Sequence, residues 1–127
     1  MRVGDVMSRE LVTVEPATPV GEAVALMSQR KVGSVLISQS GGLDGIFTER
    51  DVVRAVSHSA DATGDSVEAW MSRGPTSVEA DLSVGQALDV MLQNGFRHLP
   101  VTESGRLVGM VSMRDLSRAL AKKPQPA

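Results

Sequence analysis

The hydrophobic positions of this chain change their spacing in a regular order. Between residues 20 and 27 apolar side chains recur at the steps of an amphipathic helix, which we expect to have Thr18 as its N-cap and Pro19 as its first residue. Two short apolar runs follow, residues 32–38 and 43–47, on either side of a glycine turn. Such a pair of runs is typical of a β-hairpin. The pattern therefore predicts a helix followed by two antiparallel strands.

The same order of patterns returns in the second half of the chain. Helical spacing begins again after Asp81, and two apolar runs, 96–102 and 107–111, flank a turn at Ser104 and Gly105. The segments ahead of each helix are matched too: single helical turns are expected at 3–7 and 67–71, and brief strands at 11–14 and 75–78.

This recurrence is an internal repeat at the level of the residues themselves. A shift of 64 positions pairs residues 3–56 with 67–120 and gives 19 identities in 54 pairs, where average composition gives about three or four. We therefore divide the chain as follows: a first repeat (1–57), a polar connector (58–66), a second repeat (67–121) and a disordered tail (122–127).

Each repeat is predicted to have the order strand, helix, strand, strand, helix. A small sheet with two helices on one face leaves its other face apolar and uncovered, and a second copy can bury that face. The predicted fold class is therefore α/β (α+β), with two pseudo-symmetric β-α-β-β-α repeats packed sheet to sheet.

One seven-residue motif ends both hairpins. Residues 45–51 (GIFTERD) and 109–115 (GMVSMRD) each read glycine, two apolar residues, a hydroxyl residue, two variable residues and aspartate. Thr48 and Ser112 stand where a helix N-cap belongs, and Asp51 and Asp115 follow at the capping-box spacing. One reading is purely structural, a capped helix worth roughly 1 kcal/mol per cap.

A functional reading of the same motif is also available. A helix N-terminus after a buried strand offers free N–H groups and a positive dipole end to an anion such as phosphate. An aspartate on that turn, pointing outward, can accept hydrogen bonds from a vicinal diol. Phosphate and ribose beside each other describe a nucleotide.

Composition and charge narrow the possible partners. The net charge is −2 and the basic residues are scattered, which argues against a nucleic-acid surface. There is no cysteine, so disulfides and thiolate chemistry are excluded. No apolar run approaches the length of a membrane span, and the N-terminus lacks the apolar segment of a signal peptide. We expect a cytoplasmic protein that binds neither nucleic acid nor membrane.

An enzymatic function is not expected. The sequence contains no Ser-His-Asp pattern, no metal-ligand cluster, no P-loop and no paired carboxylates with separate acid and base roles. We therefore predict no catalytic residue, no metal and no cofactor.

The tandem repeat, the order of elements, the two motifs and the stretch FRHLPV (96–101) together resemble a pair of cystathionine-beta-synthase (CBS) domains, also called a Bateman module. The resemblance covers residues 1 to about 121. It implies a stand-alone regulatory or sensor module that binds an adenosine-containing ligand, namely AMP, ADP, ATP or S-adenosylmethionine, in clefts between the repeats. It also implies that occupancy is passed to an unknown regulated protein.

The resemblance also implies roles for particular residues. Asp51 and Asp115 would accept hydrogen bonds from ribose hydroxyls, and Thr48 and Ser112 would meet the ribose or phosphate. Each cleft would borrow residues from the other repeat. The Asp115 cleft would contain Leu11, Val12, Val32 and Gly33 with Arg97 and Ser112, and the Asp51 cleft would contain Thr76, Phe96 and Arg97 opposite Thr48.

Several further residues have two readings. Arg50 and Arg114 either face the phosphate or have a solvated or ion-paired surface role. Arg97 and His98 stand where the first repeat has Gly33 and Ser34, so the two clefts are expected to differ, with Arg97 as a phosphate contact.

Two more residues are not expected to bind the ligand. His58, at the start of the connector, has no expected partner. Trp70 replaces Val6 of the first repeat, and we expect it to pack in the core or at an interface.

Two expectations concern assembly. We predict a homodimer, because a short two-repeat chain leaves apolar helix faces uncovered. The alternative to a nucleotide sensor is a dimeric adaptor in which both motifs only cap helices and no ligand binds.

Overall fold

The computed structural model describes residues 1–122 and contains two compact units with mixed α/β structure, as predicted. Unit 1 combines Met1–Leu11 with the chain from Thr76 onward, and unit 2 is Val12–Pro75. Of the predicted tail, 122–127, only Lys122 is among the described residues, where it caps the last helix.

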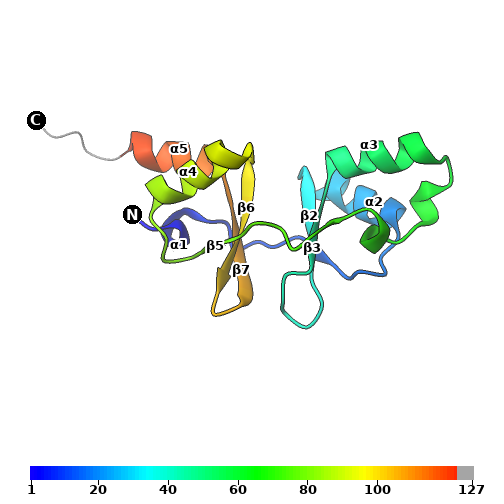
Figure 1. Ribbon diagram of the computed structural model, residues 1–127, viewed down its shortest axis with the longest axis horizontal. Helices are drawn as coiled ribbons and strands as arrows, with labels where there is room; N and C mark the ends of the chain where they lie inside the picture. Colours follow the sequence, from blue (N-terminus) through cyan, green and yellow to red (C-terminus); the bar gives the residue numbers. More distant parts are fainter. Residues whose placement is uncertain (123–127) are drawn as a thin grey trace, which may run out of the picture. The chain divides into compact units, whose positions relative to one another are not determined.

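Unit 2 is built on a four-stranded sheet with the order β1-β2-β3-β4. The β1–β2 pair is parallel, and the pairs β2–β3 and β3–β4 are antiparallel. Helices α2 and α3 lie on one side of this sheet (Figure 1). In chain order the elements are β1 (Thr13–Val14), α2 (Val20–Arg30), β2 (Ser34–Ile37), β3 (Gly45–Thr48), α3 (Glu49–His58), the 3-10 turns η1 (Ala62–Gly64) and η2 (Val67–Ala69), and β4 (Ser72–Arg73).

Unit 1 has a three-stranded sheet with the order β5-β6-β7. Its helices likewise lie on one side of the sheet (Figure 1). The turn between β6 and β7 places Ser104 at φ 52° and Gly105 at φ 79°, as the tight hairpin turn requires. The elements are α1 (Val3–Val6), β5 (Val78–Glu79), α4 (Val84–Asn94), β6 (His98–Glu103), β7 (Arg106–Ser112) and α5 (Met113–Ala121).

The first turn of each repeat packs in the unit formed by the rest of the other repeat. Val3 is fully buried in the core of unit 1, and its N–H donates to the carbonyl of Leu82 at 2.8 Å. Val67 is fully buried in the core of unit 2, and its N–H donates to the carbonyl oxygen of Thr18 at 2.8 Å. The units therefore divide the chain after residues 11 and 75, while the repeats 1–57 and 67–121 divide it at the connector.

The glycine that opens each motif is explained by this exchange. A Cβ atom on Gly45 would stand 2.5 Å from the Met71 sulfur and 2.9 Å from the carbonyl oxygen of Ser72. A Cβ on Gly109 would meet Met7 and Ser8 at the same distances. Only glycine leaves room for the exchanged segment to lie this close beside the strand.

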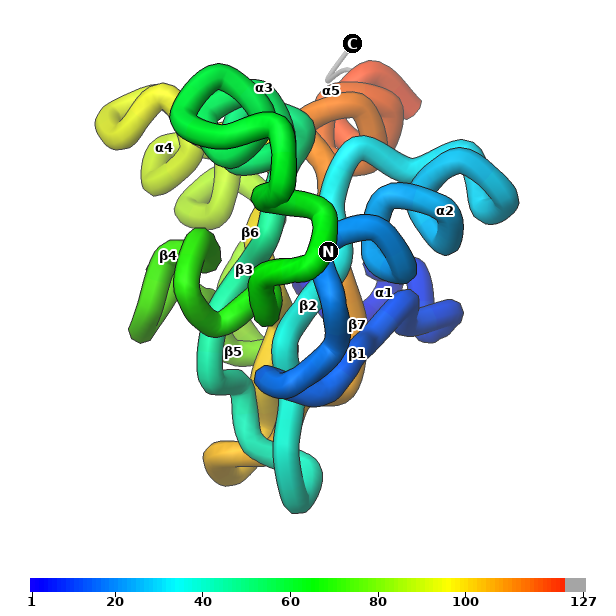
Figure 2. The backbone as a smooth tube through the Cα atoms, turned by 90° about the vertical axis from the view of Figure 1, so that its right-hand side faces the viewer, coloured from blue at the N-terminus to red at the C-terminus, as the bar shows by residue number. Residues whose placement is uncertain are grey.

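The predicted helices and hairpins are present, but the start of α2 and the strand β4 differ from the prediction. Thr18 is not the N-cap of α2: Pro19 holds that position in extended conformation, and the Thr18 carbonyl accepts from Val67. Strand β4 was not predicted. It has only two residues, both exposed and polar, so it leaves no hydrophobic pattern in the sequence. It pairs antiparallel with β3 at the edge of the unit 2 sheet, and Figure 2 labels both strands.

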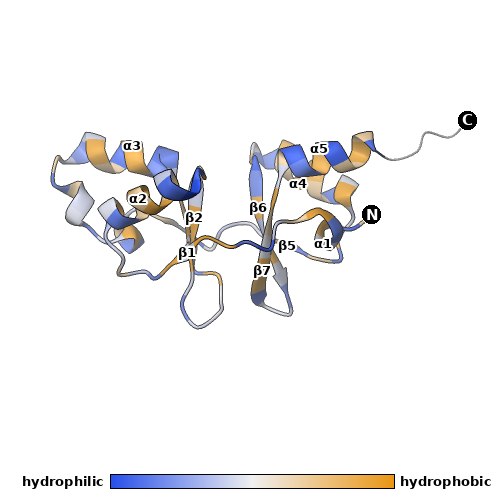
Figure 3. Cartoon of the chain, turned by 180° about the vertical axis from the view of Figure 1, so that it is seen from behind, coloured by the Kyte–Doolittle hydropathy of each residue, from blue (hydrophilic) through white to orange (hydrophobic). Residues whose placement is uncertain are grey.

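Each unit has its own hydrophobic core between helices and sheet. Apolar and polar residues alternate along α2, α3, α4 and α5, as the hydropathy colours of Figure 3 show. The core of unit 1 consists of Val3, Val78, Val84, Ala87, Met91, Leu99, Val101, Val111, Leu116 and Ala119. That of unit 2 consists of Val20, Ala23, Met27, Val35, Ile37, Phe47 and Val67.

Candidate functional site

The motif in unit 2 forms a complete capping box at the start of α3. The Asp51 N–H donates to the Thr48 hydroxyl oxygen at 3.3 Å, and the Thr48 N–H donates to Asp51 Oδ2 at 2.9 Å. The Thr48 hydroxyl lies 3.1 Å from the same carboxylate oxygen and donates to it. The predicted capping box of this motif is therefore confirmed.

The second carboxylate oxygen of Asp51 is also engaged. Arg54 Nη1 donates to Asp51 Oδ1 at 2.8 Å, which makes an ion pair one turn along α3. Asp51 is only 4% exposed. The expectation of an outward-pointing aspartate is therefore wrong for this repeat, because the carboxylate is buried and both its oxygens have partners, Thr48 and Arg54.

The motif in unit 1 has the same cap but a freer aspartate. The Asp115 N–H donates to the Ser112 hydroxyl at 3.0 Å, and the Ser112 N–H donates to Asp115 Oδ2 at 3.0 Å. Asp115 is half-buried, and within residues 1–122 no donor reaches its Oδ1. Arg118, the counterpart of Arg54, forms no ion pair with any described residue. Asp115 therefore keeps an oxygen that a ligand hydroxyl can reach.

The helix N-termini offer fewer free donors than the sequence suggested. The N–H of Met113 donates to the carbonyl oxygen of Arg97 at 2.8 Å. The N–H of Glu49 donates to the carbonyl oxygen of Gly33 at 3.1 Å. The cap residue and the aspartate also have partners. Among the first-turn N–H groups of the described helices α3 and α5, only those of Arg50 and Arg114 have no hydrogen bond.

The same backbone bonds fix where Arg97 lies. His98 pairs with Ser112 in the β6–β7 register, and the Arg97 carbonyl bonds the first residue of α5. The structure thus brings Arg97, Ser112 and Asp115 together at one end of unit 1. Gly33, Thr48 and Asp51 have the equivalent positions in unit 2, where Ser34 pairs with Thr48.

The side chains of Arg50, Arg97 and Arg114 are all exposed, so each is available to an anion. Phe96 and Thr76, in unit 1, are exposed as well. Leu11 in unit 1 is half-buried.

Unit 2 also contains a groove of about 490 Å³ between the C-terminal half of α2 and the start of α3. It includes two predicted ligand residues, half-buried Val32 and exposed Gly33, but neither Thr48 nor Asp51. Val12, half-buried on the segment before β1, lies outside it. The grouping of Leu11, Val12, Val32 and Gly33 around Asp115 stays a prediction.

Sequence reasoning missed the surroundings of Arg54. Its guanidinium carbon lies 5.8 Å from the ring centre of Trp70, within the range of a cation–π contact. Contrary to the expectation that His58 has no partner, its ring packs edge-on against the Trp70 ring, with the two ring centroids 5.6 Å apart. The identity of Arg54 with Arg118 in the repeat was the available signal, but only the fold brings Trp70 to it.

Two absences hold for the part of the chain that the structure describes. No group of three or more His, Cys, Asp or Glu residues is placed to hold a metal ion. No helix there has the length and apolar character needed to cross a membrane.

A comparison with models of known protein families identifies the family of this chain. The sequence model of the CBS domain matches residues 3–58 and again residues 67–122. The protein belongs to the CBS domain family. The two matches cover the two sequence repeats and include both capping-box motifs.

Known proteins similar to this CBS-domain chain include both sequence relatives and solved structures. An uncharacterised 17.7 kDa protein of Acidianus ambivalens is 40% identical over 121 residues, covering 94% of this chain and 73% of that protein. The crystal structure of a CBS-domain protein, ATU1752, from Agrobacterium tumefaciens is 34% identical with a TM-score of 0.85, covering 94% and 99% of the two chains.

A further solved structure contains a nucleotide. It is the AMP complex of CBSX2, a CBS-pair protein of Arabidopsis thaliana. It is 25% identical to this chain with a TM-score of 0.85, and the match covers 95% and 96% of the two chains.

Proposed function

We propose that this chain is a non-enzymatic regulatory module that binds an adenine nucleotide, such as AMP, at the motif of unit 1. The observation that carries this proposal is the free Oδ1 of Asp115, held by the Ser112 cap and close to the exposed Arg97. The AMP complex of the similar CBSX2 supports the ligand class.

Each part of the nucleotide has a complementary group in this arrangement. Asp115 Oδ1 accepts from the ribose hydroxyls, since a carboxylate can receive both hydrogens of a vicinal diol. The Arg97 guanidinium and the free N–H of Arg114 serve the phosphate. Adenine is held by aliphatic side chains, for which Leu11, Val12 and Val32 stay the predicted residues.

The proposal extends to a regulatory role. The candidate ligands are AMP, ADP, ATP and S-adenosylmethionine, and ligand occupancy is passed to a regulated partner protein. We further propose that the module is a cytoplasmic homodimer, consistent with the exposed Val53 and Val56 on α3 and Leu92 on α4.

Calorimetric titration of AMP into the protein and into Asp115→Ala tests the ribose contact. We expect affinity to fall at least ten-fold in the variant, because a hydrogen bond to a charged group contributes about 1.5–3 kcal/mol. For the wild type, 2′-deoxy-AMP should bind more weakly than AMP, and Asp115→Ala should lose that difference. Asp89→Ala, an exposed carboxylate on α4, is the matched control.

Thermal unfolding of the same samples separates ligand binding from capping. Loss of the Asp115 cap lowers the free energy of unfolding by about 1 kcal/mol in either case. Unchanged AMP affinity with that stability loss would reduce the motif to a helix cap. Absence of binding across the whole panel would favour the dimeric adaptor.

A further inference from the structure

The two copies of the motif differ in what holds the aspartate, and the difference comes from one residue outside the motif. In unit 2 the Arg54 side chain bridges from Asp51 Oδ1, at 2.8 Å, to the face of the Trp70 ring. In the second repeat Arg118 has no ion pair among the described residues, and the position equivalent to Trp70 is held in the first repeat by Val6. The arginine is thus common to both repeats and the tryptophan is not.

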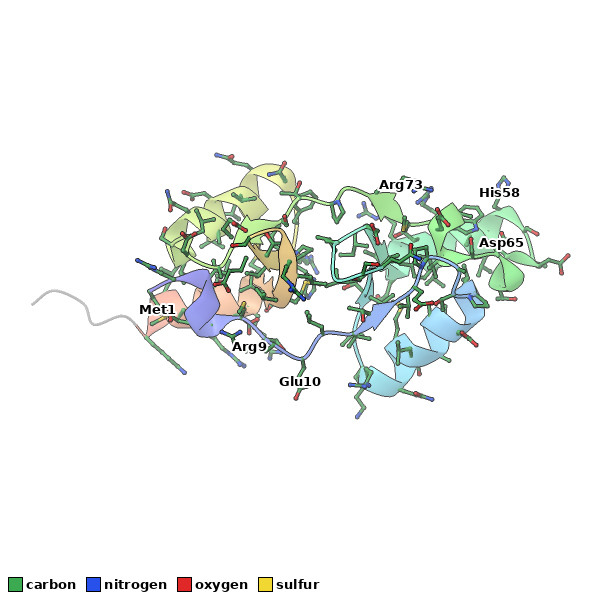
Figure 4. All side chains as sticks on the ribbon, turned by 90° about the horizontal axis from the view of Figure 1, so that it is seen from below. Met1, Arg9, Glu10, His58, Asp65 and Arg73 are labelled. Atoms are coloured by element: carbon green, nitrogen blue, oxygen red, sulfur yellow. The ribbon has the colours of Figure 1, made fainter. Side chains whose placement is uncertain are left out.

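Trp70 is itself held from two further sides. Its indole N–H donates to Asp65 Oδ2 at 3.0 Å. The His58 ring packs against it edge-on with an interplanar angle of 64°. Figure 4 labels His58 and Asp65, which lie near each other at one end of unit 2. These contacts fix the ring that faces Arg54, so the guanidinium loses less conformational freedom when it pairs with Asp51.

We infer that Arg54 and Trp70 form a lock on Asp51 that makes the first repeat the weaker nucleotide site of the module. This inference rests on the proposed function. A ribose can bind Asp51 Oδ1 only in competition with Arg54. Asp115 Oδ1, in contrast, has no hydrogen-bond partner among the described residues before the ligand binds. Unit 1 therefore fills first, and unit 2 fills only at higher nucleotide concentration, when the Arg54 contact opens.

The fluorescence of Trp70 can report on the state of the lock. Trp70 is the sole tryptophan of the chain, and its ring contacts the arginine that must move. Filling of the Asp51 site should therefore change tryptophan emission, while filling of the Asp115 site should leave it unchanged.

The test is AMP titration of the wild type and variants, followed by calorimetry and by tryptophan fluorescence. For the wild type we expect a tight phase without an emission change and a weaker phase with one. Asp115→Ala should remove only the first phase, and Asp51→Ala only the second. Arg54→Ala should tighten the second phase about three- to five-fold, the size expected for release of a partly exposed ion pair.

Two controls keep the result specific. Arg118→Ala, the same substitution in the other repeat, should change neither phase. Trp70→Phe keeps a packed ring but loses the bond to Asp65 and weakens the cation–π contact, so the second phase should tighten by less than in Arg54→Ala.

The outcomes distinguish the lock from the proposed function. Without nucleotide, Arg54→Ala should already shift Trp70 emission and Arg118→Ala should not. A second phase that is unchanged or weakened in Arg54→Ala would overturn the lock, because Arg54 would then be irrelevant or a ligand contact. Loss of all AMP binding in every protein, with the nucleotide-free emission shift intact, would instead overturn the proposed function.

Discussion

Asp51 and Asp115 show how far the same residue can differ between two matching motifs. Both take part in a capping box through the same pair of hydrogen bonds, each from a backbone N–H to a side-chain oxygen. Their remaining oxygens differ because Arg54 reaches one aspartate, supported by Trp70, while no described residue reaches the other. A functional reading of such motifs therefore depends on the neighbours that the fold supplies.

Arg97 gives a test of the phosphate contact at the level of a single side chain. We expect Arg97→Ala to lower AMP affinity about ten-fold or more, since a charge-assisted bond of this kind contributes about 1.5–3 kcal/mol. Adenosine lacks the phosphate, so its affinity should change little. Calorimetry with both ligands measures the difference.

The control for Arg97 is Arg106→Ala. Arg106 is also exposed in unit 1, but it begins β7 at the end away from Ser112. Equal losses for AMP and adenosine in Arg97→Ala would show that Arg97 maintains the shape of the site and does not bind phosphate.

At the scale of elements, the motif glycines lead to a prediction about how closely the exchanged segments lie beside β3 and β7. Gly45→Ala should destabilise the protein by about 1–3 kcal/mol, the usual cost of overpacking, because its Cβ would stand 2.9 Å from a backbone oxygen as well as 2.5 Å from the Met71 sulfur. Denaturant unfolding measures this loss.

Gly85→Ala is the matched control for Gly45. No atom lies within 4 Å of the Cβ it would add, and its position near the start of α4 favours alanine. Its stability should stay the same or rise. The prediction for Gly45 fails if both substitutions have the same effect.

The elements were predictable from sequence where hydrophobic spacing and caps define them. The hairpins, the helices after the two motifs and the capping boxes follow from patterns within a few residues. Strand β4 did not, because its two residues are polar and exposed. The Thr18 cap failed because Val67, distant in sequence, binds the Thr18 carbonyl.

The candidate site was predictable to the same extent. Thr48, Asp51, Ser112 and Asp115 could be assigned to helix starts because one short motif contains them. The engagement of Asp51 could not, since Arg54 has many possible partners in sequence and Trp70 reaches it only through folding.

At the scale of the whole molecule, the exchange of first turns makes each unit depend on a distant part of the chain. Val3→Ala should cost about 2 kcal/mol, because a fully buried valine loses two methyl groups to a cavity. The loss should appear in unit 1, as faster amide exchange in β6 and β7, although residue 3 begins the first repeat.

Val67→Ala is the reciprocal variant, with faster exchange expected in β2 and β3 of unit 2. Hydrogen exchange read by mass spectrometry resolves the two units. If Val3→Ala loosened β2 and β3 and left β6 and β7 protected, the assignment of residue 3 to unit 1 would be wrong.

The last prediction concerns assembly. On α3, Val53 is 64% exposed and Val56 52% exposed, and on α4 Leu92 is 63% exposed. Large apolar side chains gain free energy when a partner covers them, and obligate homodimer interfaces are enriched in such residues. We therefore expect a homodimer by light scattering at micromolar concentration, with and without AMP.

Val53→Asp and Leu92→Asp should each shift the protein toward monomer, because each would bury a charge at the contact. Gln93→Asp, which changes the next residue of α4, an exposed polar one, should leave the dimer intact. A monomeric wild type, or dissociation by Gln93→Asp to the same degree as Leu92→Asp, would contradict the assignment of these helix faces to the dimer.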